Sequence, residues 1–285
     1  MLTPSDKLMV YGTYVLWAGW MLRGCPLPQL SRTQRWAAAE VSVIFTLVMI
    51  AIWFFQQQTV SFTAIISAIA GVVVVSAAIR IHSIKKRIPE DIDPAKRNAL
   101  ISEEIENYTW EIGIGRWRKS FLKGWRVTLD CSWVWKLAIL TVLGTGLVLV
   151  AGYWLKPEFW LKKGFWGRLE ETLYWYLIWG IIQQFVFHAC VTSRIYSIFA
   201  KDSDPLKVET KAVWLTVLVS GLLFLFVHIP NPKLMIITPV AGAATAYIFL
   251  HCRNIWLLGV AHGILGTVIT HCLPLSMRIG PHYWS

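Results

Sequence analysis

The sequence predicts an all-α polytopic membrane protein, a bundle of seven or eight transmembrane helices. Hydrophobic residues make up 56% of the 285 residues and charged residues only 15%, whereas a soluble domain carries about 25% charged residues. Apolar runs of about 20 residues, the length that spans a bilayer, recur along the chain. There are also 17 tryptophans, and tryptophan favours the membrane–water interface. These features exclude a disordered chain, a fibrous protein and an ordinary cytosolic enzyme.

The expected spans follow from the apolar runs, taken in order. The first run is short and precedes Arg23, so it is the weakest of the eight. The other seven have the length and apolar character of spanning helices. The expected segments are Met9–Leu22, Trp36–Phe55, Val60–Ile81, Ser132–Trp154, Leu173–Ile195, Val213–Ile229, Leu234–Leu250 and Ile255–Leu273.

The chain divides into three parts: N-terminal transmembrane helices at 1–81, a basic and amphipathic loop at 82–131, and a membrane core at 132–285. The net charge is +11, and the loop holds ten of the 27 lysines and arginines. Basic loops stay on the cytoplasmic side of a membrane. We therefore expect an integral membrane protein, in a bacterial inner membrane, with the long basic loop in the cytoplasm.

The loop has two different halves. Its first half is charged and is expected to be helical near its middle. Its second half, GIGRWRKSFLKGWRV, interleaves basic residues with Trp117, Phe121 and Trp125. A spacing of four places these aromatics on one helical face, which favours a segment lying on the membrane surface. A solvated basic loop is the alternative. The partner expected for this charge is the lipid bilayer rather than nucleic acid.

Polar residues recur in an ordered way within the last four spans, where each needs a partner or a role. Gln184 and His188 are four residues apart and share a helix face. Gln183 lies beside them, rotated by about 100°. His228 and His262 follow on two later spans. Each histidine alone could be a satisfied core residue, but three on three polar-bearing segments favour a shared site.

Imidazoles that converge in a dry environment can act as acid and base or bind a metal. His188, His228 and His262 are the candidate metal ligands, with Gln184 as a hydrogen-bonding partner, and Zn or Fe is the expected ion. Such an ion would lower the pKa of bound water. The candidate catalytic set is Gln183, Gln184, His188, His228 and His262.

Three short motifs resemble those of the CPBP family of intramembrane proteases, also called the CAAX-protease and bacteriocin-processing or Abi family. The family pattern is EExxxR on one helix, FxxxH on the next and HxxxN on a later one. The corresponding stretches, all within residues 173–273, are QQFVFH ending at His188, FLFVH ending at His228, and HGILG beginning at His262. The resemblance implies a CAAX-protease-like membrane core and a peptidase that processes a membrane-bound or prenylated substrate.

The motifs depart from the family at most of its functional positions. The two glutamates fall on Gln183 and Gln184, the arginine on His188 and the asparagine on Gly266, so that only His228 and His262 are kept. A glutamine amide cannot act as a general base. Two interpretations remain: a hydrolase with a remodelled histidine-rich site, acting on a hydrophobic membrane-held substrate, or an inactive relative. The second would bind a lipid, a prenyl chain or a partner helix as an assembly or immunity factor.

Overall fold

A computed structural model describes residues 80–111, 132–155, 157–160, 164–200, 210–229 and 231–273, together with the isolated positions 38, 41, 44, 71, 74, 77 and 78. Every regular element in these ranges is a helix, which confirms the predicted all-α class. The spans expected at Met9–Leu22, Trp36–Phe55 and Val60–Ile81 lie almost entirely outside the described residues. The aromatic segment with Trp117, Phe121 and Trp125 also lies outside them.

The membrane core is built from long apolar helices. Helices α6 (Ser132–Leu155), α11 (Pro232–Cys252) and α12 (Ile255–Cys272) are long and apolar enough to cross a bilayer, and α10 (Thr210–Phe226) is a shorter apolar helix. Most of the large exposed side chains of α6 are apolar, among them Trp135, Leu143 and Trp154. A protein in water rarely exposes an apolar surface of this size. These side chains are therefore placed to contact lipid. The protein is an integral membrane protein.

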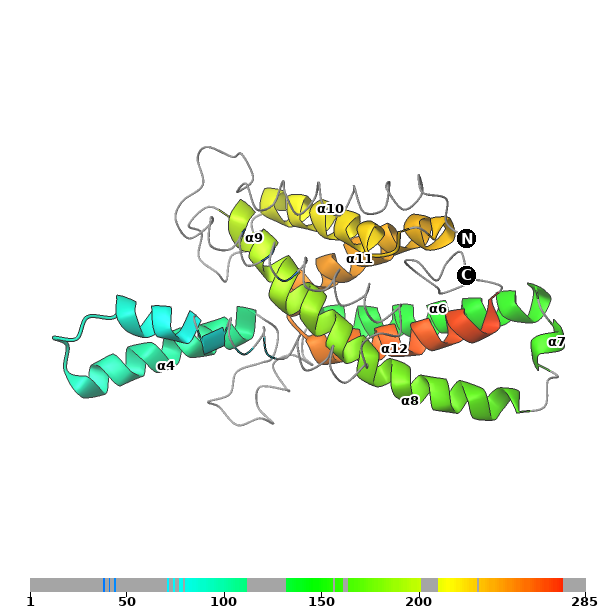
Figure 1. Cartoon of the computed structure of the whole chain (residues 1–285), viewed down its shortest axis with the longest axis horizontal. Helices are drawn as coiled ribbons and strands as arrows, with labels where there is room; N and C mark the ends of the chain where they lie inside the picture. Colours follow the sequence, from blue (N-terminus) through cyan, green and yellow to red (C-terminus); the bar gives the residue numbers. More distant parts are fainter. Residues whose placement is uncertain are drawn as a thin grey trace, which may run out of the picture.

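Three helical segments follow one another without a break across the core: α8 (Phe165–Gln184), the π-helix η2 (Phe185–Thr192) and α9 (Ser193–Phe199). A short helix, α7 (Pro157–Trp160), lies between α6 and α8 along the chain. Helix α8 packs along α12, and α10 packs along α11 (Figure 1). The continuous α8–η2–α9 run therefore contacts both helix pairs, and it contributes Gln184 and His188.

Asparagines fix the start of the last two helices. Asn231 caps α11 by accepting a hydrogen bond from the Leu234 N–H at 3.3 Å, and Asn254 caps α12 by accepting one from the Leu257 N–H at 3.0 Å. Between them, Arg253 ends α11 in the left-handed conformation, with φ of 47°. The turn between α11 and α12 is therefore tight, and the two helices begin and end near the predicted positions.

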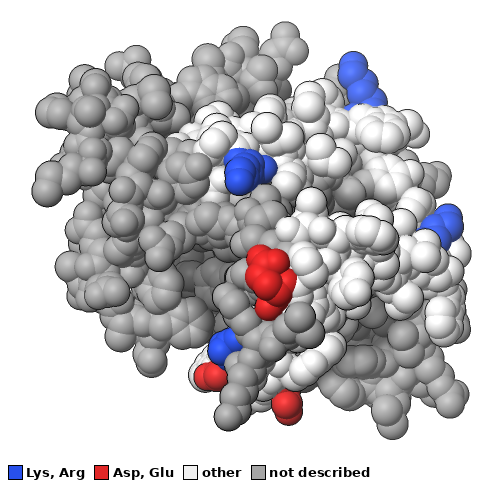
Figure 2. Space-filling view, turned by 90° about the vertical axis from the view of Figure 1, so that its right-hand side faces the viewer, with Lys and Arg blue, Asp and Glu red and all other residues white. Residues whose placement is uncertain are grey.

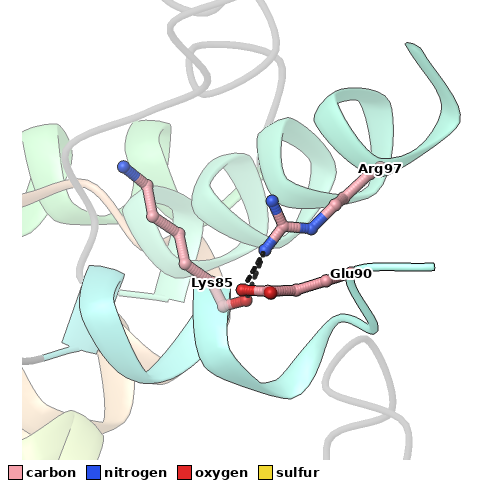
Figure 3. A network of polar contacts seen from close by, with 3 residues as sticks. All are labelled: Lys85, Glu90 and Arg97. Carbon is pink, nitrogen blue, oxygen red and sulfur yellow. Dashed lines mark hydrogen bonds and ion pairs between the residues drawn. The ribbon is translucent and has the colours of Figure 1, made fainter. Parts of the chain in front are cut away.

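The first half of the predicted loop forms a helical hairpin that projects from the core, and its second arm is α4 (Pro94–Glu111) (Figure 1). Asp93 caps α4 by accepting a hydrogen bond from the Lys96 N–H at 3.0 Å, and Pro94 follows at the first helical position. The Arg97 guanidinium lies 3.5 Å from the Lys85 carbonyl oxygen and 3.7 Å from the Glu90 carboxylate, and Figure 3 shows how the three residues face one another. The predicted helix in this half of the loop is confirmed.

One end of the molecule carries a sparse mixture of charges. Figure 2 shows this end, at the right of Figure 1, with Lys and Arg in separate places and Asp and Glu in others. Most of the described surface in this view belongs to neither class. The basic excess of the sequence is therefore not gathered into one patch on the described part of this face.

Candidate active site

Glycines bring the backbones of α8 and α12 into direct contact. A Cβ built on Gly180 would lie 2.5 Å from the Gly259 carbonyl oxygen, and one on Gly263 would lie 2.8 Å from the Leu177 Cα. No side chain larger than hydrogen fits at either place without moving the helices. This close approach allows residues of α8 and α12 to meet across the seam, and polar side chains do so at its two ends.

Gln184 and His262 form the hydrogen bond at one end of this seam. The Gln184 Nε2 lies 3.2 Å from the His262 Nδ1. An amide nitrogen only donates, so His262 Nδ1 accepts and the ring proton of the neutral imidazole sits on Nε2. His262 therefore presents an N–H donor on its other side. Gln184 is fully buried, and its Oε1 has no partner among the described residues.

His188 is held in a separate network one turn further along. Its Nδ1 lies 3.0 Å from the Thr192 Oγ1, and that hydroxyl donates to the Phe187 carbonyl at 3.0 Å. Because the threonine proton is used there, His188 Nδ1 carries the proton and Nε2 keeps its lone pair. The Ser220 hydroxyl of α10 lies 3.2 Å from Thr192. The ring stacks on Phe249, with centroids 5.3 Å apart, and is fully buried.

His228 lies in the turn that follows α10 rather than within the helix. Its Nδ1 lies 2.6 Å from the Phe224 carbonyl oxygen. A carbonyl only accepts, so Nδ1 carries the proton and the Nε2 lone pair is free to take another. Thr238 of α11 donates to the same carbonyl at 3.2 Å. The backbone thus fixes the tautomer of His228 as the reverse of that of His262.

The structure brings the three predicted histidines into one region. The η2 segment, which contains His188, contacts both α10, which ends just before His228, and α12, which contains His262. His228 and His262 are partly accessible, whereas His188 and Gln184 have 0% of their surface exposed. Only the first two side chains therefore have exposed surface.

Gln183 stands apart from this arrangement. It is partly exposed, and in the described part of the chain no hydrogen bond joins it to any of the three histidines. Its rotation away from Gln184 around α8 accounts for this separation. Of the two glutamines singled out in the sequence, the structure joins one to a histidine.

Within the described ranges, no three His, Cys, Asp or Glu side chains are placed to hold an ion. The Nδ1 atoms of His188 and His262 have different hydrogen-bond partners, Thr192 and Gln184. The Zn or Fe site at His188, His228 and His262 stays a prediction.

The π-helix is a feature that the sequence did not indicate. Segment η2 begins directly after Gln184 and contains His188. A π-turn widens the helix and is often found at functional sites. Here it keeps Gln184 directed to α12 while His188 is directed to α10 and α11.

Two polar residues of the site were not anticipated. Thr192 lies four residues after His188, so the same spacing rule that paired Gln184 with His188 could have found it. Ser220 had only its polarity within an apolar helix as a signal. Thr192 binds His188 directly and Ser220 binds Thr192, so both residues hold the buried imidazole in place.

Residues 164–268 match the family described as Rce1-like, type II CAAX prenyl endopeptidase Rce1-like. The match includes Gln184, His188, His228, His262 and Gly266, and it confirms the resemblance found in the motifs. No curated protein and no solved structure matches the chain at a significant level.

Proposed function

We propose that the Rce1-like domain at residues 164–268 acts as a membrane-embedded peptidase with a remodelled site, in which two imidazoles replace the missing glutamates. His228 is the general base, and His262 is the donor that stabilises the oxyanion. Gln184 is a positioning residue that orients His262. His188 is a buried support rather than a group that touches substrate.

The observation that carries this proposal is the opposite tautomer of the two accessible histidines. His228 offers a lone pair on Nε2 because the Phe224 carbonyl binds its Nδ1–H. His262 offers an N–H on Nε2 because the Gln184 amide binds its Nδ1. Hydrolysis needs one acceptor for the proton of water and one donor for the developing oxyanion. The two imidazoles supply one of each.

The reaction balances with these groups alone. The water oxygen bonds to the carbonyl carbon of the peptide while His228 Nε2 takes a water proton. The oxyanion that forms is bound by the His262 Nε2–H. The carbon–nitrogen bond then breaks, and the His228 imidazolium gives its proton to the leaving nitrogen. The products are a carboxylic acid and an amine, and the imidazole is restored.

The surroundings favour a hydrophobic substrate held in the membrane. Two of the helices that frame the site, α11 and α12, are long and apolar enough to span the bilayer, so an approaching peptide has to be anchored near lipid. A prenylated or otherwise membrane-tethered peptide meets this requirement, and the type of endopeptidase for which the matching family is named agrees with it.

The test uses the full chain reconstituted in lipid vesicles and a membrane-tethered, prenylated peptide. Wild type is expected to cleave it. His228→Ala should lower kcat by about 10²–10⁴-fold, and His262→Ala by about 10²–10³-fold. His82→Ala, a change at an exposed histidine of the projecting hairpin, is the matched control and should leave kcat unchanged.

Metal content is measured on the same samples. Zinc or iron bound in stoichiometric amount, and lost together with activity in His228→Ala, would replace this mechanism with a metal-dependent one. A wild type that is inert and free of metal would refute the proposed enzymatic activity and favour the non-catalytic relative. Binding of the prenylated peptide in vesicles to the protein would then be measured to test that alternative.

A further inference from the structure

We infer that Tyr176 is the positioning residue that fixes the register of α12 against α8, and thereby holds His262 opposite Gln184. This inference rests on the proposed function for its kinetic consequence. Its structural basis is the contact between the Tyr176 ring and the backbone of Gly266, one turn after His262 on α12.

The ring occupies the space that a side chain at position 266 would need. A Cβ built on Gly266 would lie 2.8 Å from the Tyr176 Cδ1 and 2.9 Å from its Cε1. A Cβ on Gly263 would lie 2.9 Å from the Tyr176 carbonyl oxygen. The tyrosine therefore lies in a notch that exists only because α12 has glycine at these places.

The hydroxyl ties the ring to the next turn of α12. The Tyr176 and Thr270 hydroxyl oxygens are 3.2 Å apart, and Thr270 also donates to the Gly266 carbonyl at 2.7 Å. The ring thus contacts Gly266 with its edge and Thr270 with its hydroxyl. It spans one turn of α12 and resists movement of that helix along its axis.

This contact acts together with the other contacts of the seam. Glycines 259 and 263 allow the α8 backbone and side chains to approach α12 closely. Tyr176 adds a ring and a hydroxyl contact on the turns of α12 that follow His262. A slide of one residue along α12 is about 1.5 Å. The Gln184 Nε2–His262 Nδ1 distance is already 3.2 Å, so such a slide breaks that bond.

The experiment compares four variants in the full reconstituted chain: Tyr176→Phe, Tyr176→Ala, Gly266→Ala and the double variant Tyr176→Ala/Gly266→Ala. Gly167→Ala is the matched control, since a Cβ at Gly167 on α8 meets nothing within 4 Å. Activity is read as kcat and KM separately. The ¹⁵N NMR signals of His262, after histidine labelling, report whether Nδ1 still accepts the hydrogen bond from Gln184.

Tyr176→Ala and Gly266→Ala are each expected to lower kcat by about 10²-fold, as a misplacement of about 1 Å does, and to shift the His262 Nδ1 signal. KM should change little. Tyr176→Phe keeps the ring and should lose less than about tenfold. In the double variant the added methyl no longer meets the ring, so its kcat should exceed that of Gly266→Ala.

Unchanged His262 signals in Tyr176→Ala would overturn the inference. So would a double variant whose fold-loss of kcat equals the product of the losses in the two single variants. If wild type cleaves no peptide, the proposed function fails. The NMR comparison then still decides the role of Tyr176, because it requires no turnover.

Discussion

Gln184 has a neutral amide at the position where the resembling motif has a carboxylate, which can take a proton from water. Its amide has no accessible proton equilibrium, so it can only orient a neighbour. The 3.2 Å contact with His262 assigns it that role. The same residue leaves Oε1 without a partner in the described part of the chain, an arrangement that costs about 1–3 kcal/mol. Under the proposed function, this cost accompanies the orientation of His262 by Gln184.

Restoring carboxylates at both glutamines should not produce an efficient protease. The double variant Gln183→Glu/Gln184→Glu gains a base, but a carboxylate at position 184 has no N–H to replace the amide that now binds His262 Nδ1. Position 266 also remains a glycine covered by Tyr176. We expect kcat in the vesicle assay to stay at or below that of wild type. A gain of about tenfold or more, which is about 1.4 kcal/mol of barrier, would show that the fold still supports the glutamate chemistry that the motif resemblance implies.

Thr192 should matter for stability more than for catalysis. Thr192→Val removes the hydroxyl that binds His188 Nδ1 and Ser220 Oγ inside a fully buried region. We expect the free energy of unfolding to fall by about 1–3 kcal/mol, because buried donors and acceptors lose their partners. Unfolding is followed by circular dichroism in detergent.

Thr245→Val is the control for that measurement, since the Thr245 hydroxyl bonds to carbonyls of its own helix. Equal losses of stability in the two variants would contradict the network around His188.

The sequence identified which side chains form the site better than it identified their hydrogen-bond partners. Gln184, His188, His228 and His262 could be selected because polar side chains in apolar spans need a role. The tautomers could not be selected, because the Phe224 carbonyl decides that of His228 and the Gln184 amide decides that of His262, and the sequence does not show which ring nitrogen each of these groups meets. The metal site that the three histidines suggested stays a prediction.

At the scale of the helices, the seam between α8 and α12 decides whether the site exists. Glycine contacts are followed along it by two polar pairs, Tyr176 with Thr270 and Thr172 with His271, whose Oγ1 and Nε2 atoms are 2.8 Å apart. The polar pairs lie on the far side of the glycines from Gln184. A change of spacing anywhere along this seam is therefore transmitted to His262.

Gly180→Ala should separate the two helices. Its methyl group would lie 2.5 Å from the Gly259 carbonyl oxygen, which forces the backbones apart and costs about 1–3 kcal/mol, as overpacking does. Activity should fall with stability, because the Gln184–His262 bond spans the same seam. Both are measured on one preparation.

Gly146→Ala on α6 is the matched change, since a methyl group there meets nothing within 4 Å. It should be neutral or slightly stabilising, because alanine is a better helix former than glycine. A Gly180→Ala variant that behaved like Gly146→Ala would refute the tight seam.

Element boundaries were predicted with unequal success. The apolar runs placed the limits of α11 and α12 within two residues of their observed ends, and Asn231 and Asn254 cap the two starts. The run from α8 to α9 extends beyond the predicted Leu173–Ile195 at both ends. The π-helix within it could not be predicted, because an extra residue in a turn leaves no trace in hydropathy.

Considered as a whole, the described molecule combines a membrane core with a charged helical hairpin that projects from it (Figure 1). The hairpin carries Lys85, Lys86 and Arg87, which are exposed. We expect it to lie on the cytoplasmic side, because basic loops remain there. Trypsin added to inside-out vesicles should cut the chain near these residues, whereas trypsin added to right-side-out cells should not. Cutting from the outside would reverse the assigned orientation.

The bond between Gln184 and His262 joins residues 78 positions apart in the chain, and this separation has a consequence for biosynthesis. Ribosomes add about 5–20 residues per second, so Gln184 is made about 4–16 s before His262 at these rates. During that interval the glutamine side chain is already within or near the bilayer, without the partner that it has in the finished protein. A polar group in hydrocarbon is costly, so the half-made core has to retain water or a lipid headgroup beside Gln184, or be shielded by the insertion machinery, until the last helix arrives.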